Sequence, residues 1–281
     1  MSNLPATALL TELRSKDYDR YILLMFGAAK YRDDLAALML FNAELAQVRD
    51  QVSEPLLGLM RLQWWRDGLD ALGTSTQPPH NLLDRFAALA RRGVDLTPLQ
   101  LLIDAREHDL ADHPFPNTAA YHYYQDATTR PLALVAAAIL GQREAAGDFA
   151  AALANYAQIG LLRALPFWLH RNALPLPSDM LAAHGIDGDA WRAGEPQPGL
   201  PALVKTIVRQ QTEKIAALRQ KITTMPRPAR HAAAPLLLHN DLAGFYAAQL
   251  RRRNYDVMNR RTPTSALSVL PTLLWRVLRL Y

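Results

Sequence analysis

A clear helical pattern runs from Asp33 to Asp50, with the sequence DDLAALMLFNAELAQVRD. Its apolar residues recur at spacings of three and four, which is the period of one face of an α-helix. They are Leu35, Leu38, Phe41, Leu45 and Val48. Residues 56–72 repeat the pattern with Leu59, Leu62, Trp65 and Leu69. We therefore expect two helices here, each burying one face.

Helical periodicity continues through almost the whole chain. Further helices are expected at 82–92, 98–112, 118–140, 145–170, 179–184, 201–224 and 235–255. Thr97 and Gln100 form a capping box around a proline, and Asn81 is a suitable cap for the helix that follows it. No segment sustains the alternation typical of a strand. The loops, such as MPRP at 225–228, are too short for a domain linker, so we expect one all-α domain over residues 1–281 without internal repeats.

The composition is that of a folded, soluble protein. Half of the 281 residues are hydrophobic and a fifth are charged, which argues against disorder. The chain has no cysteine, which excludes disulfides, thiolate metal sites and thiol nucleophiles. The first 20 residues carry no recognisable targeting signal, and the longest apolar run, residues 131–141, is too short to cross a bilayer.

Basic residues are concentrated in the last third of the chain. Residues 201–281 hold 14 Lys and Arg against three acidic residues, a net charge of +11, whereas residues 1–200 carry −6. Such asymmetry points to an anionic partner, which is a lipid surface, nucleic acid or an acidic protein. Solvated helix faces are the alternative explanation. The candidate residues for the partner surface are Arg251, Arg252, Arg253, Arg260, Arg261, Arg276 and Arg279.

The acidic residues do not form a convincing metal site. Glu44 and Asp50 are six residues apart and diverge on a helix, and the residue one turn before Asp50 is Ala46, which cannot coordinate a metal. A richer stripe is formed by Asp104, His108 and Asp112, with Asp109 and His113 beside it. We interpret this stripe, and Asp67 with Asp70, as parts of the solvent-exposed faces of amphipathic helices. Phosphate loops, nucleophile elbows and zinc-binding motifs are absent from the sequence.

Aromatic residues cluster at Trp64-Trp65, at residues 121–124 and at Phe167-Trp168, where they fill the core or line an apolar pocket. The C-terminal segment LSVLPTLLWRVLRLY, residues 267–281, combines Leu and Trp with two arginines three positions apart. If it is helical beyond Pro271, it suits either docking to a membrane surface or partner, or closing the core.

Taken in order, several segments resemble the squalene/phytoene synthase family over nearly the whole chain. They are Arg32 before the ALMLF helix, GLMRLQWWRDGLDAL at 58–72, LLIDAREHDL at 101–110, Tyr124, Leu162-Arg163, Leu176-Pro177 and FYAAQLRRRNYDV at 245–257. The resemblance implies an isoprenoid-synthase-like helical bundle around a central cavity. It also implies two DxxxD helices, whose carboxylates hold the Mg²⁺ ions that bind substrate diphosphate.

At the positions of those motifs this chain departs from the family. The first falls on AQVRD, with Ala46 at the leading position and Asp50 at the trailing one. The second falls on ALPFW, with Ala164 and Trp168 at the two acidic positions. Three of the four ligands are therefore expected to be missing, and we expect neither a metal nor another cofactor.

The departures resemble a non-catalytic branch of the family, which assists the assembly of respiratory complex I and includes bacterial relatives. The segments that carry this second resemblance are residues 41–65, LLRALPFW, LPLPSDMLAAHGI and the terminal LLWRVLRLY. It implies a pseudoenzyme that binds an isoprenoid or other lipid, an anionic membrane surface or a subunit of the respiratory complex. For a bacterial relative we expect a cytoplasmic location, peripheral to the inner face of the cytoplasmic membrane.

Two alternatives stay open. In the first, the chain is an active prenyl transferase with a reorganised Mg²⁺ site, with Asp50, Asp109, Tyr124 and Arg163 as the candidate catalytic residues. The candidate replacement ligands are then Asp104, Asp109 and His108. Nucleic-acid binding through the arginine clusters is the weaker alternative, because no recognised binding motif accompanies them.

Overall fold

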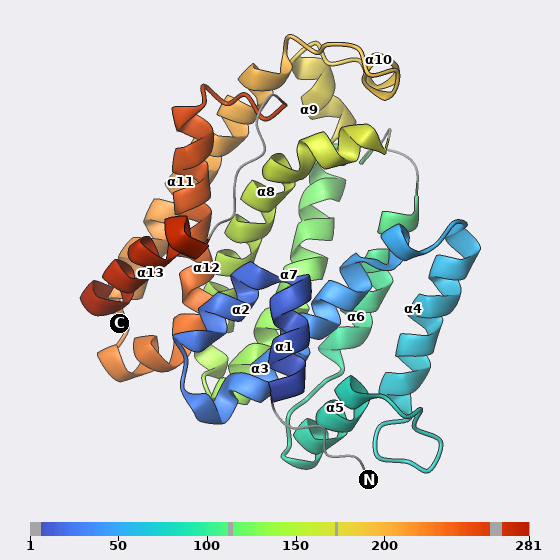
Figure 1. The fold of residues 1–281 in the computed structure, drawn as a ribbon, viewed down its shortest axis with the longest axis vertical. Helices are drawn as coiled ribbons and strands as arrows, with labels where there is room; N and C mark the ends of the chain where they lie inside the picture. The colour runs from blue at the N-terminus through green and yellow to red at the C-terminus, as the bar shows by residue number, and fades with distance from the viewer. Residues whose placement is uncertain (1–6, 112–114, 172–173, 259–265, 281) are drawn as a thin grey trace. The chain divides into compact units, whose positions relative to one another are not determined.

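The computed structural model describes residues 7–111, 115–171, 174–258 and 266–280. These residues form α-helices, short 3-10 helices and loops, and none of them lies in a strand (Figure 1). The predicted all-α class is confirmed. The chain packs into two compact units: unit 1 comprises Met1–Ala111, Ala127–Ala150 and His231–Leu236, and unit 2 comprises Asp112–Asp126, Ala151–Arg230 and Leu237–Tyr281. A single domain over residues 1–281 stays a prediction.

The helices follow one another along the chain in this order. The first are α1 (Thr7–Lys16), α2 (Tyr18–Met25), α3 (Ala29–Ala46), η1 (Val48–Gln51), α4 (Pro55–Asp70), α5 (Asn81–Arg91), α6 (Pro98–Arg106) and η2 (Glu107–Leu110). They are followed by α7 (Thr118–Leu140), η3 (Arg143–Ala145), α8 (Ala146–His170), α9 (Ser178–Ala183), α10 (Gly188–Arg192), α11 (Leu200–Thr224), α12 (Arg227–Arg252) and α13 (Ala266–Leu280). Residues of α7, α8 and α12 belong to both units.

Helix α3 is the centre of unit 1. Every residue from Asp34 to Ala43 is buried, so the helix is covered on all sides and not on the single face that its periodicity predicted. Helices α1, α2, α5 and α6 pack against it. A helix that is apolar around its whole circumference is stable only in such a position, because it would otherwise expose hydrophobic surface to water.

Aromatic rings and glycines fit α4 and α5 to this centre. The ring of Phe41 meets the rings of Trp65 and Phe86 edge-on, at centroid distances of 5.1 and 5.3 Å. A Cβ atom at Gly68 would lie only 2.7 Å from Cδ1 of Leu83, so the missing side chain lets α4 approach α5. Close packing of this kind is typical of protein interiors and leaves little tolerance for added volume.

Several helix ends differ from the sequence-based expectations. Helix α3 ends at Ala46, and Asp50 lies on the separate turn η1. Thr97 has helical backbone angles and its side chain forms no cap bond. The cap of α5 is His80, not Asn81. Helix α12 begins at Arg227, inside the expected MPRP loop, because proline is tolerated in the first turn of a helix.

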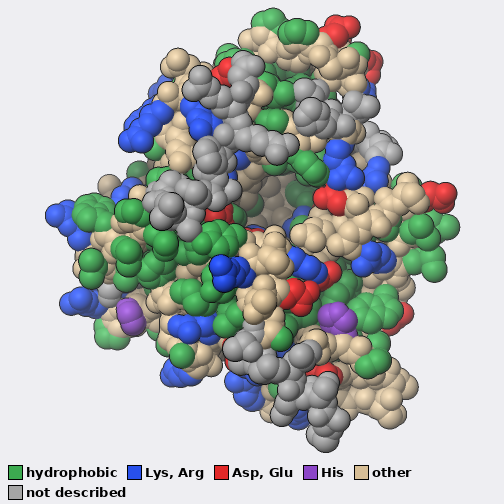
Figure 2. Space-filling model, viewed as in Figure 1, with side chains coloured by type: hydrophobic (Ala, Val, Ile, Leu, Met, Phe, Trp, Pro, Cys, Tyr) green, Lys and Arg blue, Asp and Glu red, His purple; other side chains and the backbone are tan. Residues whose placement is uncertain are grey.

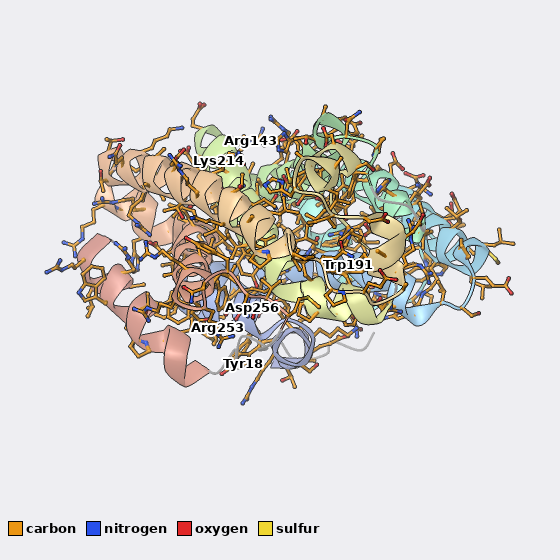
Figure 3. All side chains as sticks on the ribbon, turned by 90° about the horizontal axis from the view of Figure 1, so that it is seen from above. Tyr18, Arg143, Trp191, Lys214, Arg253 and Asp256 are labelled. Carbon is orange, nitrogen blue, oxygen red and sulfur yellow. The ribbon has the colours of Figure 1, made fainter. Side chains whose placement is uncertain are left out.

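Helices α1, α2 and α10 form in segments for which the apolar periodicity predicted no helix. Helix α10 is short and is capped by Asp187, whose carboxylate accepts hydrogen bonds from the backbone of Asp189 and Ala190. It carries Trp191, a large side chain that is fully buried in unit 2 (Figure 3). This short helix therefore contributes to the core despite its length.

Unit 2 is held together by polar residues on α12. The buried amide of Asn240 accepts a hydrogen bond from Asn155 of α8 at 2.8 Å and donates one to the backbone oxygen of Ile215 of α11 at 3.1 Å. The next residue, Asp241, accepts from Arg219 of α11 at 3.0 Å and pairs with Arg276 of α13 at 3.2 Å. Two neighbouring positions thus connect three other helices to α12.

Helix α12 ends where the backbone changes its direction. Asn254 and Tyr255 have φ values of +52° and +62°, a conformation that stops a helix of L-residues. Arg253 and Asp256 flank this turn (Figure 3), and the amide of Asp256 donates to the backbone oxygen of Arg253. The expected end at residue 255 therefore lies three residues too late.

We expect Asp34→Asn to destabilise the protein by about 2 kcal/mol. Asp34 is 1% exposed within α3, and its two carboxylate oxygens pair with Arg85 at 2.5 Å and Arg92 at 2.5 Å. Removal of the negative charge leaves two guanidinium groups without their charged partner, and partial exposure of both arginines limits the loss of stability.

Urea denaturation of Asp34→Asn measures the loss of stability. The matched control is Asp33→Asn, at a half-buried neighbouring position, which should change stability by less than about 0.5 kcal/mol. Equal effects of the two substitutions would contradict this assignment.

Stability should fall at acidic pH through His80. Its Nδ1 accepts a hydrogen bond from the amide of Leu82 at 3.2 Å, and its ring packs edge-on against Trp64 and Trp65. Burial lowers the pKa of His80, and the acidic residues nearby offset this only in part. The unfolded chain therefore binds the proton more readily, so stability decreases as pH falls through the ordinary histidine pKa of about 6.5.

The comparison that isolates this effect uses His80→Asn, which keeps a capping side chain and does not titrate. Urea denaturation of both proteins at several pH values between about 8 and 5.5 measures the effect. As the pH falls over this range, the unfolding free energy of the wild-type protein should decrease relative to that of His80→Asn. A difference that is independent of pH would show that protonation of His80 costs nothing.

Candidate functional site

The first expected motif position lies at the exposed end of α3. Ala46 is the last residue of the helix, and Asp50 is exposed on η1. Glu44, two residues before the end of the helix, pairs with Lys16 of α1. Burial opposes the charge on Lys16, but hydrogen bonds to Glu44 and Glu12 outweigh it and raise the pKa of Lys16. The carboxylate of Glu44 is thus committed to an ion pair within unit 1.

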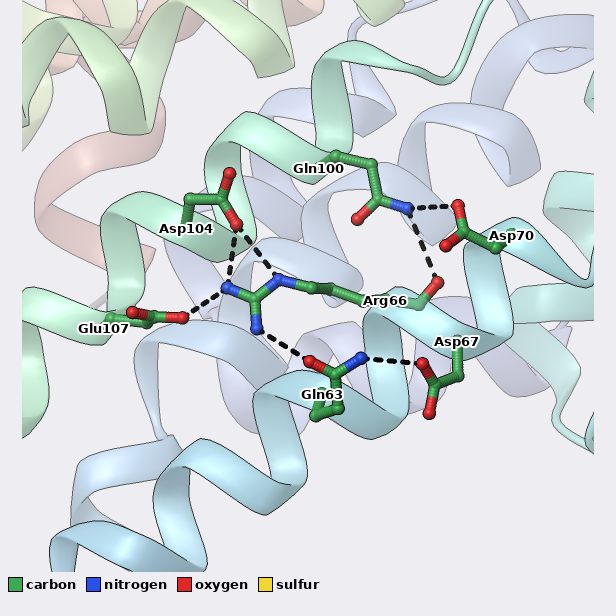
Figure 4. Close-up of polar contacts among 7 residues, drawn as sticks. All are labelled: Gln63, Arg66, Asp67, Asp70, Gln100, Asp104 and Glu107. Atoms are coloured by element: carbon green, nitrogen blue, oxygen red, sulfur yellow. Dashed lines mark hydrogen bonds and ion pairs between the residues drawn. The ribbon is translucent and has the colours of Figure 1, made fainter.

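The acidic stripe on α6 and η2 is neutralised by arginine. Arg66 of α4 donates to Asp104 at 2.7 Å and to Glu107 at 2.5 Å (Figure 4). Asp109 pairs with Arg106 at 3.0 Å. Burial opposes the charge on Arg66, and the two carboxylates still raise its pKa. These carboxylates therefore balance positive charge of the chain itself.

Neighbouring acidic residues take part in the same surface network. Gln63 donates to Asp67 at 2.7 Å, and Gln100 donates to Asp70 at 2.8 Å (Figure 4). Within the described ranges, no three His, Asp or Glu side chains are grouped so that they could share a metal ion. Asp112 and His113, which complete the predicted stripe, lie outside the described residues.

The second expected motif position lies on α8 in unit 2. Ala164 and Trp168 are partly exposed and occupy successive turns of the helix. The indole of Trp168 meets the ring of Phe167 edge-on at 5.5 Å. On the same helix, the guanidinium of Arg163 lies 3.4 Å from the ring centre of the buried Tyr246 on α12. Arg163 therefore makes a cation–π contact inside unit 2.

A buried polar cluster lies between α7 and α8. The hydroxyl of Tyr121 donates to Oε1 of Gln158 at 2.8 Å, and Nε2 of Gln125 donates to the same oxygen at 2.5 Å. Burial raises the pKa of Tyr121 far above its ordinary value, so the hydroxyl stays protonated. Tyr124, a candidate catalytic residue of the transferase alternative, packs its ring on Phe115 at a centroid distance of 5.1 Å. The four-residue spacing of Tyr121 and Gln125 was the available signal for this cluster.

The arginines of the predicted surface for an anionic partner differ in their exposure and in their contacts. Arg251 and Arg252 are exposed, and Arg253 is partly exposed at the end of α12. Arg276 is engaged with Asp241, whereas Arg279 is exposed and stacks on Trp275. Arg260 and Arg261 lie outside the described residues.

Exposed apolar side chains gather over α4 and, separately, over α13 (Figure 2). On α4 they are Leu56, Leu57, Leu59, Met60 and Trp64. The prediction that Leu59 is buried was therefore wrong. On α13 they are Leu274, Trp275 and Leu278. No helix among the described residues is long and apolar enough to cross a membrane.

Related proteins cover most of this chain. It is 34% identical over 178 residues to a Bos taurus protein named NADH dehydrogenase (ubiquinone) complex I, assembly factor 6, across 62% of this chain and 53% of that protein. The chain therefore spans about half the length of this relative. The Homo sapiens protein of the same name is 28% identical over 251 residues, which cover 88% of this chain and 74% of the relative.

Solved structures share the fold at low sequence identity. The squalene synthase HpnC of Alicyclobacillus acidocaldarius superposes with a TM-score of 0.74 at 16% identity, over 89% of this chain and 94% of that one. A dehydrosqualene synthase crystallised with a ligand superposes with a TM-score of 0.76 at 12% identity, over 96% and 94% of the two chains. The isoprenoid-synthase-like fold is thereby confirmed. The sequence profile of squalene/phytoene synthases matches residues 13–268, and this chain belongs to the squalene/phytoene synthase family.

Proposed function

We propose that this chain is a non-catalytic member of the family, which acts in the biogenesis of respiratory complex I by binding a lipid or a protein. The observation that carries the proposal is the chemistry of the side chains at the expected metal positions. Ala46 and Ala164 end in methyl groups and Trp168 in an indole, so none of them offers the oxygen ligand that Mg²⁺ requires. A Mg²⁺ cluster of the usual kind does not fit these residues.

The state of the remaining carboxylates supports the same conclusion. Asp104 and Asp109, the replacement ligands of an active transferase, are paired with Arg66 and Arg106. Recruitment to a metal would require each to exchange a guanidinium for the ion. Departure of a diphosphate from an allylic substrate needs strong stabilisation of its negative charge, and this set of residues offers no preorganised source of it through metal ligands.

The role in biogenesis is inferred from the relatives. Proteins of 28–34% identity carry the name of an assembly factor of complex I, and one of these alignments extends over 88% of this chain. The anionic-partner surface and the exposed apolar helices suit a protein that binds other components. We expect the chain to work at the inner face of the cytoplasmic membrane, where a bacterial respiratory complex is assembled.

The purified chain should show no Mg²⁺-dependent turnover of farnesyl or geranylgeranyl diphosphate, measured as pyrophosphate release. It should also gain no thermal stability from MgCl₂ with pyrophosphate. An intact site at 100 times its Kd would add about 2.7 kcal/mol and raise the melting temperature by several degrees. A catalytically active family member serves as the positive control in both assays.

Turnover, or metal-dependent stabilisation, would overturn the pseudoenzyme proposal. Asp109→Asn and Asp50→Asn then identify the site: loss of the stabilisation in either variant would establish the reorganised transferase. If the chain is the proposed pseudoenzyme, addition of MgCl₂ and pyrophosphate leaves the melting temperature of each variant unchanged.

In the source organism, deletion of the gene should lower the amount of assembled NADH:ubiquinone oxidoreductase, measured by native gel and by NADH oxidation in isolated membranes. The wild-type gene and the Asp50→Asn, Asp109→Asn double variant should restore the complex equally, because no metal-dependent reaction is needed. Unchanged complex I after deletion would contradict the assembly role. Rescue by the wild type alone would contradict the non-catalytic mechanism.

A further inference from the structure

Helix α13 is fixed to unit 2 through one of its faces. Val269 and Leu273 are buried, and one turn later Arg276 pairs with the buried carboxylate of Asp241 at 3.2 Å. Asp241 also accepts from Arg219 of α11 at 3.0 Å. The inner face therefore combines apolar contacts with an ion pair, and it gives α13 a defined orientation on α12.

The outer face of α13 is also apolar. Leu278 is 80% exposed, Leu274 is 51% exposed and Trp275 is 47% exposed. These residues, with the exposed Pro271, recur at spacings of three and four and form one stripe on the side opposite to Val269 and Leu273. A helix that only closed the core would present polar residues here, so this stripe is suited to contact with an apolar environment.

The charges around this stripe identify the kind of environment. Arg276 and Arg279 place their guanidinium groups 4.8 and 4.7 Å from the ring centre of Trp275. Arg279 is exposed, and residues 257–281 contain no acidic side chain. Tryptophan beside arginine, next to exposed leucines, is the combination that favours the headgroup region of a bilayer, where the ring and aliphatic chains are buried and the guanidinium meets phosphate.

We propose that the outer face of α13 is a docking site for an anionic membrane surface. The helix lies in the plane of the membrane, with Leu274, Trp275 and Leu278 at the boundary between headgroups and acyl chains. Its 15 residues are too few to span the hydrocarbon core. Residues 237–281 carry seven arginines and two aspartates, and this excess of positive charge adds long-range attraction to negatively charged lipid.

The exposed apolar stripe of α4 provides a matched contrast. Leu56 and Met60 are similarly exposed, but the acidic residues Glu54, Asp67 and Glu107 on or beside α4 are exposed as well. Glu107 is paired with Arg66, and Arg61 of α4 is exposed, so charges of both signs surround this stripe and no excess of positive charge attracts an anionic surface. The two stripes therefore allow the effect of hydrophobic exposure alone to be separated from that of hydrophobic exposure with positive charge.

The test is flotation of the full chain with vesicles of phosphatidylcholine alone or of equal parts of phosphatidylcholine and phosphatidylglycerol. The wild type should float with the anionic vesicles and far less with the neutral ones. The Leu274→Glu, Leu278→Glu double variant should lose at least about tenfold in partitioning, and Arg279→Glu should lose about fivefold to tenfold. The control, Leu56→Glu with Met60→Glu on α4, should float like the wild type.

Fluorescence locates the contact without a change of charge. Addition of anionic vesicles should shift the tryptophan emission of the wild type to shorter wavelength, and Trp275→Phe should remove most of this shift. Circular dichroism establishes that each variant has kept its helical content. A variant that fails to fold is replaced by Leu278→Ser, at the most exposed apolar position of the stripe, which should also reduce flotation.

Three results would overturn the proposal: no flotation of the wild type, equal flotation with neutral vesicles, or equal loss in the α4 control. Retardation of duplex DNA in a gel without vesicle binding would assign the basic region to nucleic acid. This inference extends the proposed function by naming a lipid surface, and its failure is distinguishable from failure of that function. Vesicle binding reports on α13 alone, whereas pyrophosphate release and Mg²⁺-dependent melting report on the metal positions.

Discussion

Burial of the central part of α3, from Asp34 to Ala43, is the constraint on which unit 1 depends. A helix without an exposed face must be covered by its neighbours on every side, and α1, α2, α5 and α6 pack against it. The same burial gives the Asp34 carboxylate a desolvation penalty, because a charged group in the interior is stable only beside a positive partner. Arg85 and Arg92 meet this need from α5 and from its C-terminal cap. The ion pairs therefore define how α5 is placed against the central helix.

In unit 2, buried polar residues of α12 also determine how the neighbouring helices are placed. Asn240 and Asp241 are buried next to each other, and their hydrogen-bonding groups are satisfied by α8, α11 and α13. Each of these bonds has a direction, unlike an apolar contact, so together they restrict the sliding and rotation of the helices. One consequence is functional: with its inner face held by this ion pair and by the buried Val269 and Leu273, α13 turns Leu274, Trp275 and Leu278 outward.

In this family the fold depends on many residues, whereas the metal-assisted chemistry depends on a few. The backbone arrangement persists at 12–16% identity to two synthases, because the pattern of apolar positions can be satisfied by many sequences. Metal-assisted departure of a diphosphate depends on a few oxygen atoms at defined places, and one substitution can remove such an atom. Our proposal for Ala46, Ala164 and Trp168 is therefore compatible with an intact scaffold. Arginine pairing of Asp104 and Asp109 gives the remaining acidic residues a structural use.

The sequence alone determined the helical class, the family and most helix positions, since these depend on local periodicity and on the order of motifs along the chain. It did not determine that α3 is buried on all sides or that Leu59 is exposed, because periodicity shows which residues share a face and not how many faces are covered. The helix ends at Ala46 and Arg252 were not predicted either, because apolar periodicity does not indicate that the chain continues after Ala46 as the 3-10 turn η1, or that Asn254 and Tyr255 adopt positive φ values. Only the tertiary structure showed that Asp104 faces Arg66 and that Arg276 faces Asp241, because residues 35 to 38 positions apart are brought together by packing and not by sequence spacing.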